Sequence, residues 1–89
     1  LVVNPTHFSV ALLYDRDVME APQVIAKGAD FLALRMRTIA NENAVPIVEK
    51  PALARELYAS VEIGEPIPER LFKVIAEILA QIYRLRPQR

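Results

Sequence analysis

Four consecutive residues carry the side chains best suited to covalent chemistry: Asn4, Pro5, Thr6 and His7. An asparagine side chain is commonly attacked by the backbone nitrogen of the next residue, but proline has no backbone N–H and closes that route. The reverse reaction remains available. The Asn4 amide nitrogen attacks the Asn4 carbonyl carbon, closes a five-membered succinimide and expels the Pro5 nitrogen. The tetrapeptide therefore predicts autocatalytic cleavage of the Asn4–Pro5 bond.

The other two residues of the tetrapeptide fit the same reaction. The expelled proline nitrogen needs a proton, and His7 is placed to give one. Asparagine followed by proline favours a β-turn, which is closed by a hydrogen bond from the fourth N–H to the first carbonyl. That bond puts the His7 N–H on the Asn4 oxygen, where negative charge develops during attack, as a one-donor oxyanion hole. Thr6 leaves the turn type open, because a type II turn requires a positive φ at this position.

An amide nitrogen is a weak nucleophile, so the fold must hold Asn4 near its attack geometry. Cleavage within about an hour requires a barrier of roughly 22 kcal/mol. An intein-like shift is disfavoured, because the Thr6 hydroxyl lies one residue too far from the bond. The reaction happens once per chain, so we expect no turnover enzyme. Asn-Pro is also a common turn opener, and a protein-binding module with an uncut turn remains an alternative.

The composition narrows the remaining functions. The 89 residues, 53% of them apolar, suit one small domain with a single core. Eleven basic and eleven acidic residues give a formal net charge of zero, so the positive field typical of nucleic-acid-binding proteins is missing. The chain has no cysteine and one histidine, which leaves few ligands for a metal. We expect no metal and no cofactor.

No apolar run approaches the roughly 20 residues of a membrane span, and no signal-peptide pattern opens the chain. The sequence predicts a soluble piece of protein. It begins with an apolar run at Leu1 and lacks a start methionine, so we expect a fragment of a longer protein. Residues 1–4 then form a strand remnant ahead of the cleavage site, and residues 5–89 form the main body.

Strands are predicted on both sides of the tetrapeptide. Residues 1–3 and 8–14 are apolar enough to pair as an antiparallel hairpin. Both faces of the second segment are largely apolar, which is typical of a central strand covered on two sides. A short apolar run, 23–27, predicts a third strand stopped by Gly28.

Asp30 is predicted to cap a helix that runs to about Asn43. Its inward face is predicted to carry Leu32, Met36, Ile39 and Ala40. Residues 45–49 predict a fourth strand, which makes a right-handed strand–helix–strand crossover.

The last third of the chain is predicted to be helical. A second helix spans 51–59 with Leu53 and Leu57 inward, and an extended connector spans 61–67. A third helix opens at Pro68, and its predicted buried stripe is Leu71, Ile75, Ile78, Ile82 and Leu85. The predicted fold class is therefore α/β, a single compact domain with a small mixed four-stranded sheet surrounded by helices.

Two surface segments have open alternatives. Lys27, Gly28 and the connector 61–67 are either part of a recognition surface for a partner or ordinary turn residues. The basic cluster Arg84, Arg86 and Arg89 either contacts acidic lipid or a partner helix or is a solvated terminus.

The tetrapeptide between two strands resembles the FlhB, YscU, SpaS and EscU family of type III secretion proteins. Longer stretches resemble the flagellar branch in particular: 8–12, 21–29, 45–49, 53–58 and 62–68. The resemblance implies cleavage between Asn4 and Pro5 by asparagine cyclisation, with the two pieces staying in one folded unit.

The resemblance also implies a cellular role. In the family this domain follows membrane-spanning helices, lies at the cytoplasmic face of the bacterial inner membrane, and helps switch export from rod and hook to filament proteins. The implied partners are other export-gate proteins, the hook-length control protein and export substrates, with membrane contact only through an absent N-terminal region. An injectisome homologue that switches to translocator or effector export is the alternative within the family.

Overall fold

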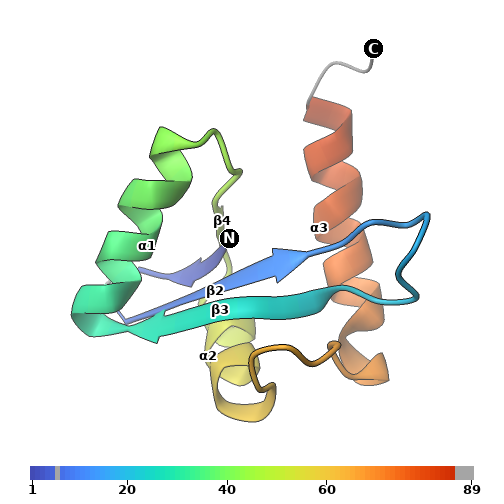
Figure 1. The fold of residues 1–89 in the computed structure, drawn as a ribbon, viewed down its shortest axis with the longest axis horizontal. Helices are drawn as coiled ribbons and strands as arrows, with labels where there is room; N and C mark the ends of the chain where they lie inside the picture. The colour runs from blue at the N-terminus through green and yellow to red at the C-terminus, as the bar shows by residue number, and fades with distance from the viewer. Residues whose placement is uncertain (6, 86–89) are drawn as a thin grey trace.

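The computed structural model describes residues 1–5 and 7–85, without the side chain of residue 85. Over this range the elements are β1 (Val2–Asn4), β2 (Phe8–Leu13), β3 (Gln23–Ala29), α1 (Asp30–Glu42), β4 (Val48–Glu49), α2 (Pro51–Ser60), the 3-10 turn η1 (Glu69–Leu71) and α3 (Phe72–Leu85). Figure 1 shows the strands side by side with helices around them. The predicted α/β fold class is confirmed.

The described strands form one mixed sheet in the order β3-β2-β1-β4. β1 and β2 pair antiparallel, with Asn4 opposite Phe8, which confirms the hairpin predicted around the tetrapeptide. β1 also pairs parallel with β4. The strand that ends at Asn4 therefore lies inside the sheet, between two neighbours.

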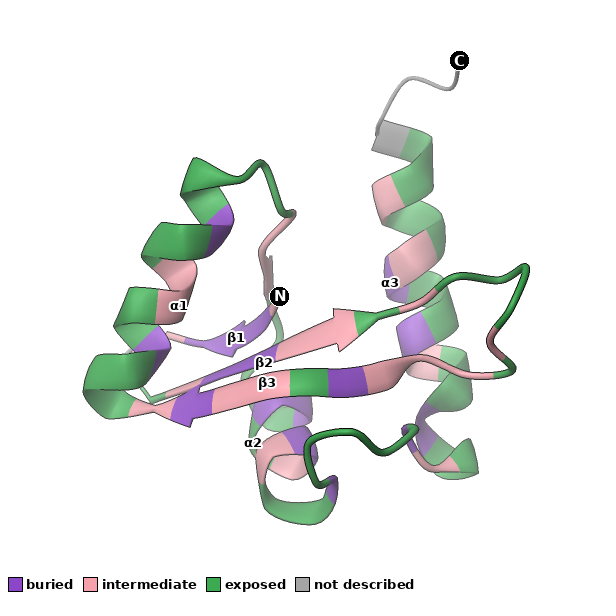
Figure 2. Cartoon of the chain, in the orientation of Figure 1, coloured by how far each residue is buried: buried purple, intermediate pink, exposed green. Residues whose placement is uncertain are grey.

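β2 is the central strand that its apolar faces predicted. Ser9 and Val10, which point to opposite faces, are both 0% exposed. The Ser9 hydroxyl donates to the Ala33 carbonyl of α1 at 2.9 Å, and Val10 belongs to the core formed with α2 and α3. Helix α1 thus covers one face of the sheet, and α2 and α3 cover the other (Figure 2).

The core confirms the inward faces predicted for α2 and α3. Leu53 and Leu57 are buried, as are Leu71, Ile75 and Ile78, and Ile82 is half-buried. The side chain of Leu85 lies outside the described part of the chain. Pro68 does not begin α3: it precedes the turn η1, and α3 begins at Phe72.

The predicted end of β3 at Gly28 is wrong. β3 continues to Ala29, and α1 follows without a loop. A Cβ atom on Gly28 would lie 2.7 Å from Leu32 Cγ and 3.0 Å from Met36 Sδ. The glycine therefore makes room for the Leu32 and Met36 side chains of α1 and does not interrupt the strand.

Two further predictions for α1 are corrected. Ala29, and not Asp30, is the N-cap residue, and no side chain caps the helix. The buried positions are Ala33 and Ala40, whereas Leu32 is 53% and Ile39 47% exposed. Ala40 is therefore buried as predicted, whereas Leu32 rests partly on Gly28 and leaves about half of its side chain exposed.

β4 is shorter than the predicted segment 45–49, because it pairs only through Val2 with Val48 and Val3 with Glu49. From the pairings, β3 runs parallel to β4. Helix α1 therefore connects two parallel strands, as predicted, and these strands lie at opposite edges of the sheet. The hand of this crossover stays a prediction.

Gly28→Ala is expected to destabilise the fold by about 1–3 kcal/mol, because the added methyl group overpacks the contact with α1. Thermal unfolding of the variant measures the loss. Leu32→Ala alone should cost little, since this side chain is half exposed. In the double variant the smaller side chain relieves the clash, so the two effects should be clearly non-additive; strict additivity would contradict the overpacking.

Candidate functional site

The tetrapeptide lies at the end of the sheet where β1 turns into β2. Asn4 is the last residue of β1 and is 9% exposed. Pro5 is half-buried, and His7 is exposed directly before β2. Thr6 lies outside the described residues.

The turn is closed as its sequence predicted. The His7 backbone N–H donates to the Asn4 carbonyl oxygen, with an N···O distance of 2.9 Å. That carbonyl belongs to the Asn4–Pro5 peptide bond, and donors at 2.7–3.1 Å from an oxyanion are typical of acyl-transfer sites. The geometry therefore places a donor on the atom that asparagine cyclisation would charge; its catalytic contribution stays a prediction.

A second hydrogen bond holds the other side of His7. The backbone N–H of Asp30 donates to the His7 carbonyl at 2.7 Å. Asp30 has a positive φ of 53°, and this contact was missed in the sequence. The available signal was an aspartate, one of the residues that tolerate this conformation, at the join of a strand and a helix.

Asn4 is more buried than its turn position suggested. Its cross-strand partner Phe8 stacks on Tyr58 of α2, with ring centroids 4.5 Å apart. Directly opposite residues of an antiparallel pair share one face of the sheet, so the Asn4 side chain lies on the face covered by α2. We expect confinement on this face to limit the rotamers of the Asn4 amide, which is what a near-attack conformation requires.

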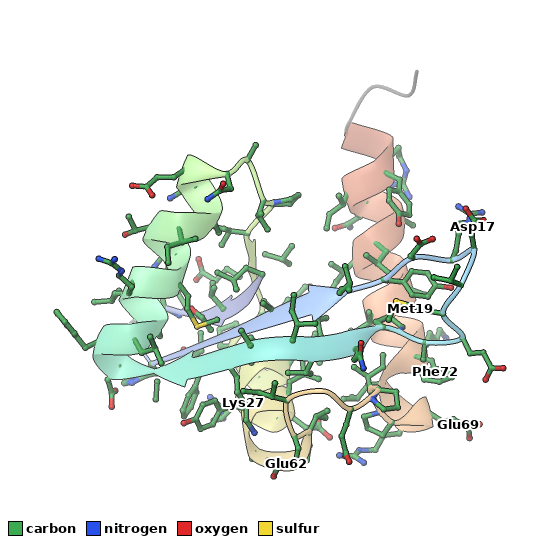
Figure 3. The ribbon with its side chains drawn as sticks, in the orientation of Figure 1. Asp17, Met19, Lys27, Glu62, Glu69 and Phe72 are labelled. Carbon is green, nitrogen blue, oxygen red and sulfur yellow. The ribbon has the colours of Figure 1, made fainter. Side chains whose placement is uncertain are left out.

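Lys27 extends this layer of contacts. Its ammonium group donates to the carbonyl oxygens of Tyr58 and Val61, each at 2.9 Å, and lies 5.3 Å from the centre of the Tyr58 ring. Figure 3 shows Lys27 directed from β3 toward α2. These carbonyls end α2 and have no intrahelical donor, so Lys27 stabilises the end of the helix.

These contacts bear on the recognition surface suggested for Lys27 and Gly28. Lys27 is engaged within the chain, and Gly28 is buried under α1. Neither residue lies in a turn, because both belong to β3. The connector 61–67 keeps an exposed stretch, 62–66, while Val61 and Ile67 are buried.

Other chemistry has little support in the described part of the chain. No group of three metal-ligating residues comes together there, and none of its helices has the length and apolar character to cross a membrane. The ion pair between Arg70 and Glu56, 2.7 Å long, is exposed and contributes little stability. Arg84 lies on α3, whereas Arg86 and Arg89 fall outside the described residues.

Comparison with known proteins identifies relatives of the whole domain. A family described as the FlhB HrpN YscU SpaS Family matches residues 1–82. The flagellar biosynthetic protein FlhB of Bacillus subtilis (strain 168) is 51% identical over 86 residues, which are 97% of this chain and 24% of that protein. The chain thus spans about a quarter of the length of this relative.

Solved structures share the fold. The cytoplasmic domain of FlhB from Shewanella putrefaciens is 44% identical with a TM-score of 0.90, over 96% of this chain and 70% of that one. A mutated EscU C-terminal domain is 32% identical with a TM-score of 0.87, over 90% of this chain and 80% of that one.

Proposed function

The chain belongs to the FlhB HrpN YscU SpaS family, and on that premise we propose that it is the part of a flagellar type III export protein that cuts its own backbone between Asn4 and Pro5. The family resemblance of its sequence is thereby confirmed. The flagellar branch is favoured because the FlhB relative is 51% identical, against 32% for the EscU domain.

The observation that carries the proposal is the 2.9 Å hydrogen bond from the His7 N–H to the Asn4 carbonyl. The Asn4 Nδ2 atom attacks this carbonyl carbon and gives its proton to the His7 imidazole, and the resulting oxyanion is held by the His7 N–H. Collapse breaks the C–N bond to Pro5. The proline nitrogen takes a proton from the His7 imidazolium, leaving a succinimide on one piece and a secondary amine on the other.

Thr6, which lies outside the described residues, enters the proposal only as the spacer that makes His7 the fourth residue of the turn. The reaction needs no cofactor and occurs once in each chain. The domain is therefore a self-modifying switch rather than a turnover enzyme.

The position of β1 supports a cut that leaves the fold intact. Val2 and Val3 are 3% and 1% exposed and pair with strands on both sides. Breaking the chain after Asn4 removes the covalent turn but no rung of the sheet. With further chain ahead of Leu1, cleavage thus frees the start of the Pro5 segment while β1 stays held by ladder hydrogen bonds and apolar contacts. Four residues alone are too few for lasting retention.

This local change is the proposed switch from rod and hook substrates to filament substrates. The partners are other export-gate proteins, the hook-length control protein and the export substrates, and nucleic acid has no part. The domain works at the cytoplasmic face of the inner membrane, attached through parts of the protein beyond this chain. The likeness to EscU keeps an injectisome homologue as the alternative, and the substrates exported in a complementation test discriminate the two.

Mass spectrometry of the chain with an N-terminal fusion partner tests the cleavage directly. We expect denatured samples to show a fragment beginning at Pro5, formed without protease at neutral pH. A fusion that persists intact for days would contradict self-cleavage and favour a binding module with an uncut turn.

His7→Ala is expected to slow cleavage by a factor of about 10² to 10⁴, which is typical for the loss of a general acid. The backbone N–H on the Asn4 oxygen survives the substitution, so cleavage should continue at the lower rate. A time course after synthesis measures the rate, and added imidazole should restore part of it because the position is exposed. An unchanged rate would make the His7 side chain a bystander.

A further inference from the structure

The join between β3 and α1 has an unusual backbone. β3 ends at Ala29 and α1 begins at Asp30, with no residue between them. Asp30 has φ +53°, a left-handed conformation that aspartate, asparagine and glycine tolerate and that β-branched residues avoid. The chain thus changes direction at a single residue.

This conformation directs a backbone donor at the tetrapeptide. The regular pairing of β2 with β3 ends at Phe8 and Ala29. Beyond it, the Asp30 N–H donates to the His7 carbonyl at 2.7 Å. As the first residue of a helix, Asp30 has no intrahelical acceptor for this N–H, so the His7 carbonyl satisfies it.

The donor is fixed by packing rather than by the turn itself. The Leu32 and Met36 side chains of α1 pack directly on Gly28, where an added Cβ atom would lie 2.7 Å and 3.0 Å from them, so the start of α1 is packed against the end of β3. His7 is then held on both sides: its carbonyl accepts from Asp30, and its N–H donates to the Asn4 oxygen at 2.9 Å.

We propose that Asp30 is a positioning residue for cleavage of the Asn4–Pro5 bond, acting through its left-handed backbone and its N–H on the His7 carbonyl. The inference rests on the proposed self-cleavage. The carboxylate of Asp30 takes no part in it. What matters is a residue at position 30 that keeps both a backbone N–H and a positive φ.

Three variants of the fusion protein test this in a time course after cell-free synthesis. Asp30→Asn and Asp30→Gly retain the conformation and should cleave within about threefold of the unmodified chain. Asp30→Val disfavours it, and small misplacements of reacting groups cost up to about a hundredfold in rate. We expect Asp30→Val to cleave ten to a hundred times more slowly.

Ile78→Val is the matched control for lost stability, because Ile78 is a buried residue of α3 that does not belong to the turn. It should weaken the fold and leave the cleavage rate unchanged. The proposal is overturned if Asp30→Val cleaves at the normal rate, if Asp30→Asn and Asp30→Gly are as slow as Asp30→Val, or if Ile78→Val is equally slow. Failure of the unmodified chain to cleave would instead overturn the proposed function, and this inference with it.

A second measurement covers the case in which Asp30→Val fails to fold. Hydrogen exchange is recorded on the uncleaved Asn4→Ala chain, where the Asp30 amide should be protected together with the His7 amide. Free exchange of the Asp30 amide in that folded chain would overturn the proposal.

Discussion

Asn4→Ala is expected to leave the bond before Pro5 intact for days under conditions in which the unmodified chain is cut. The methyl group of alanine offers no nucleophile, and the bond is left to uncatalysed hydrolysis. Intact mass measured on the N-terminal fusion gives the result directly. The appearance of the Pro5 fragment from this variant would show that another group attacks the carbonyl.

Asn4→Gln is the matched control for this substitution. It keeps a side-chain amide but moves the nitrogen one methylene farther from the carbonyl, so that a larger ring must close. The fold should hold the longer side chain poorly, because the position is only 9% exposed. Cleavage of Asn4→Gln at the normal rate would contradict attack from a preorganised side chain.

The same burial means that Asn4→Ala is not silent for stability. The turn hydrogen bond uses the backbone carbonyl of residue 4 and survives, while packing against the face covered by α2 is lost. We expect a cost of about 1 kcal/mol, or a lowering of Tm by roughly 4–8 °C for a domain of this size. The variant therefore remains folded while its chemistry stops.

In cells, a whole protein with Asn4→Ala is expected to export rod and hook proteins and to fail in the change to filament proteins. Complementation of a strain that lacks the natural protein, with the secreted proteins identified, measures this. Normal filament export by the uncut protein would contradict the proposed role of cleavage in switching the export substrates.

Local interactions account for what the sequence predicted of the site. The turn closure joins residues three apart, and the strands on both sides follow from their own apolar residues. The burial of Asn4 has no such signal, since it depends on α2, which comes from a distant part of the chain and packs against β1 and β2. Its burial was missed for that reason.

The face of α1 shows a second limit. Hydrophobicity alone predicted that Leu32, Ile39 and Ala40 face inward. The structure confirms Ala40, buries Ala33 as well, and leaves Leu32 and Ile39 about half exposed. Leu32 and Met36 pack on Gly28, so a residue that is commonly a strand breaker serves here as a packing surface. Leu32 and Met36 follow Gly28 by only four and eight residues, and their contact packs the start of α1, where Asp30 donates to His7, against the end of β3.

Asn4→Asp is expected to convert the cleavage into an acid-dependent reaction. The substitution keeps the shape of the side chain and replaces its amide by a carboxyl group. A neutral carboxylic acid can protonate the leaving proline nitrogen and then close on the carbonyl, whereas an ionised carboxylate has no proton to give. The variant should therefore be cut slowly or not at all at neutral pH.

The sign of the pH dependence follows from the ionisation of this carboxyl group. An aspartate in water has a pKa of about 3.9, and burial at position 4 would raise the pKa because it disfavours the charged form. The reactive neutral form predominates below that pKa and falls about tenfold for each pH unit above it. The cleavage rate should therefore rise as the pH is lowered, and it should level off only below the pKa.

Two controls isolate the effect of the fold. Asn4→Ala at the same acid pH gives the background of hydrolysis, and Asn4→Asp unfolded in urea gives the rate of the peptide without its turn. The folded Asn4→Asp variant, its fold checked by circular dichroism, should be cleaved faster than both controls. The unmodified chain should show no acid preference of this kind, because its amide does not titrate in this range. If Asn4→Asp were cut at neutral pH as fast as the unmodified chain, the side-chain amide could not be the essential nucleophile, and attack by water or by Thr6 would have to replace it.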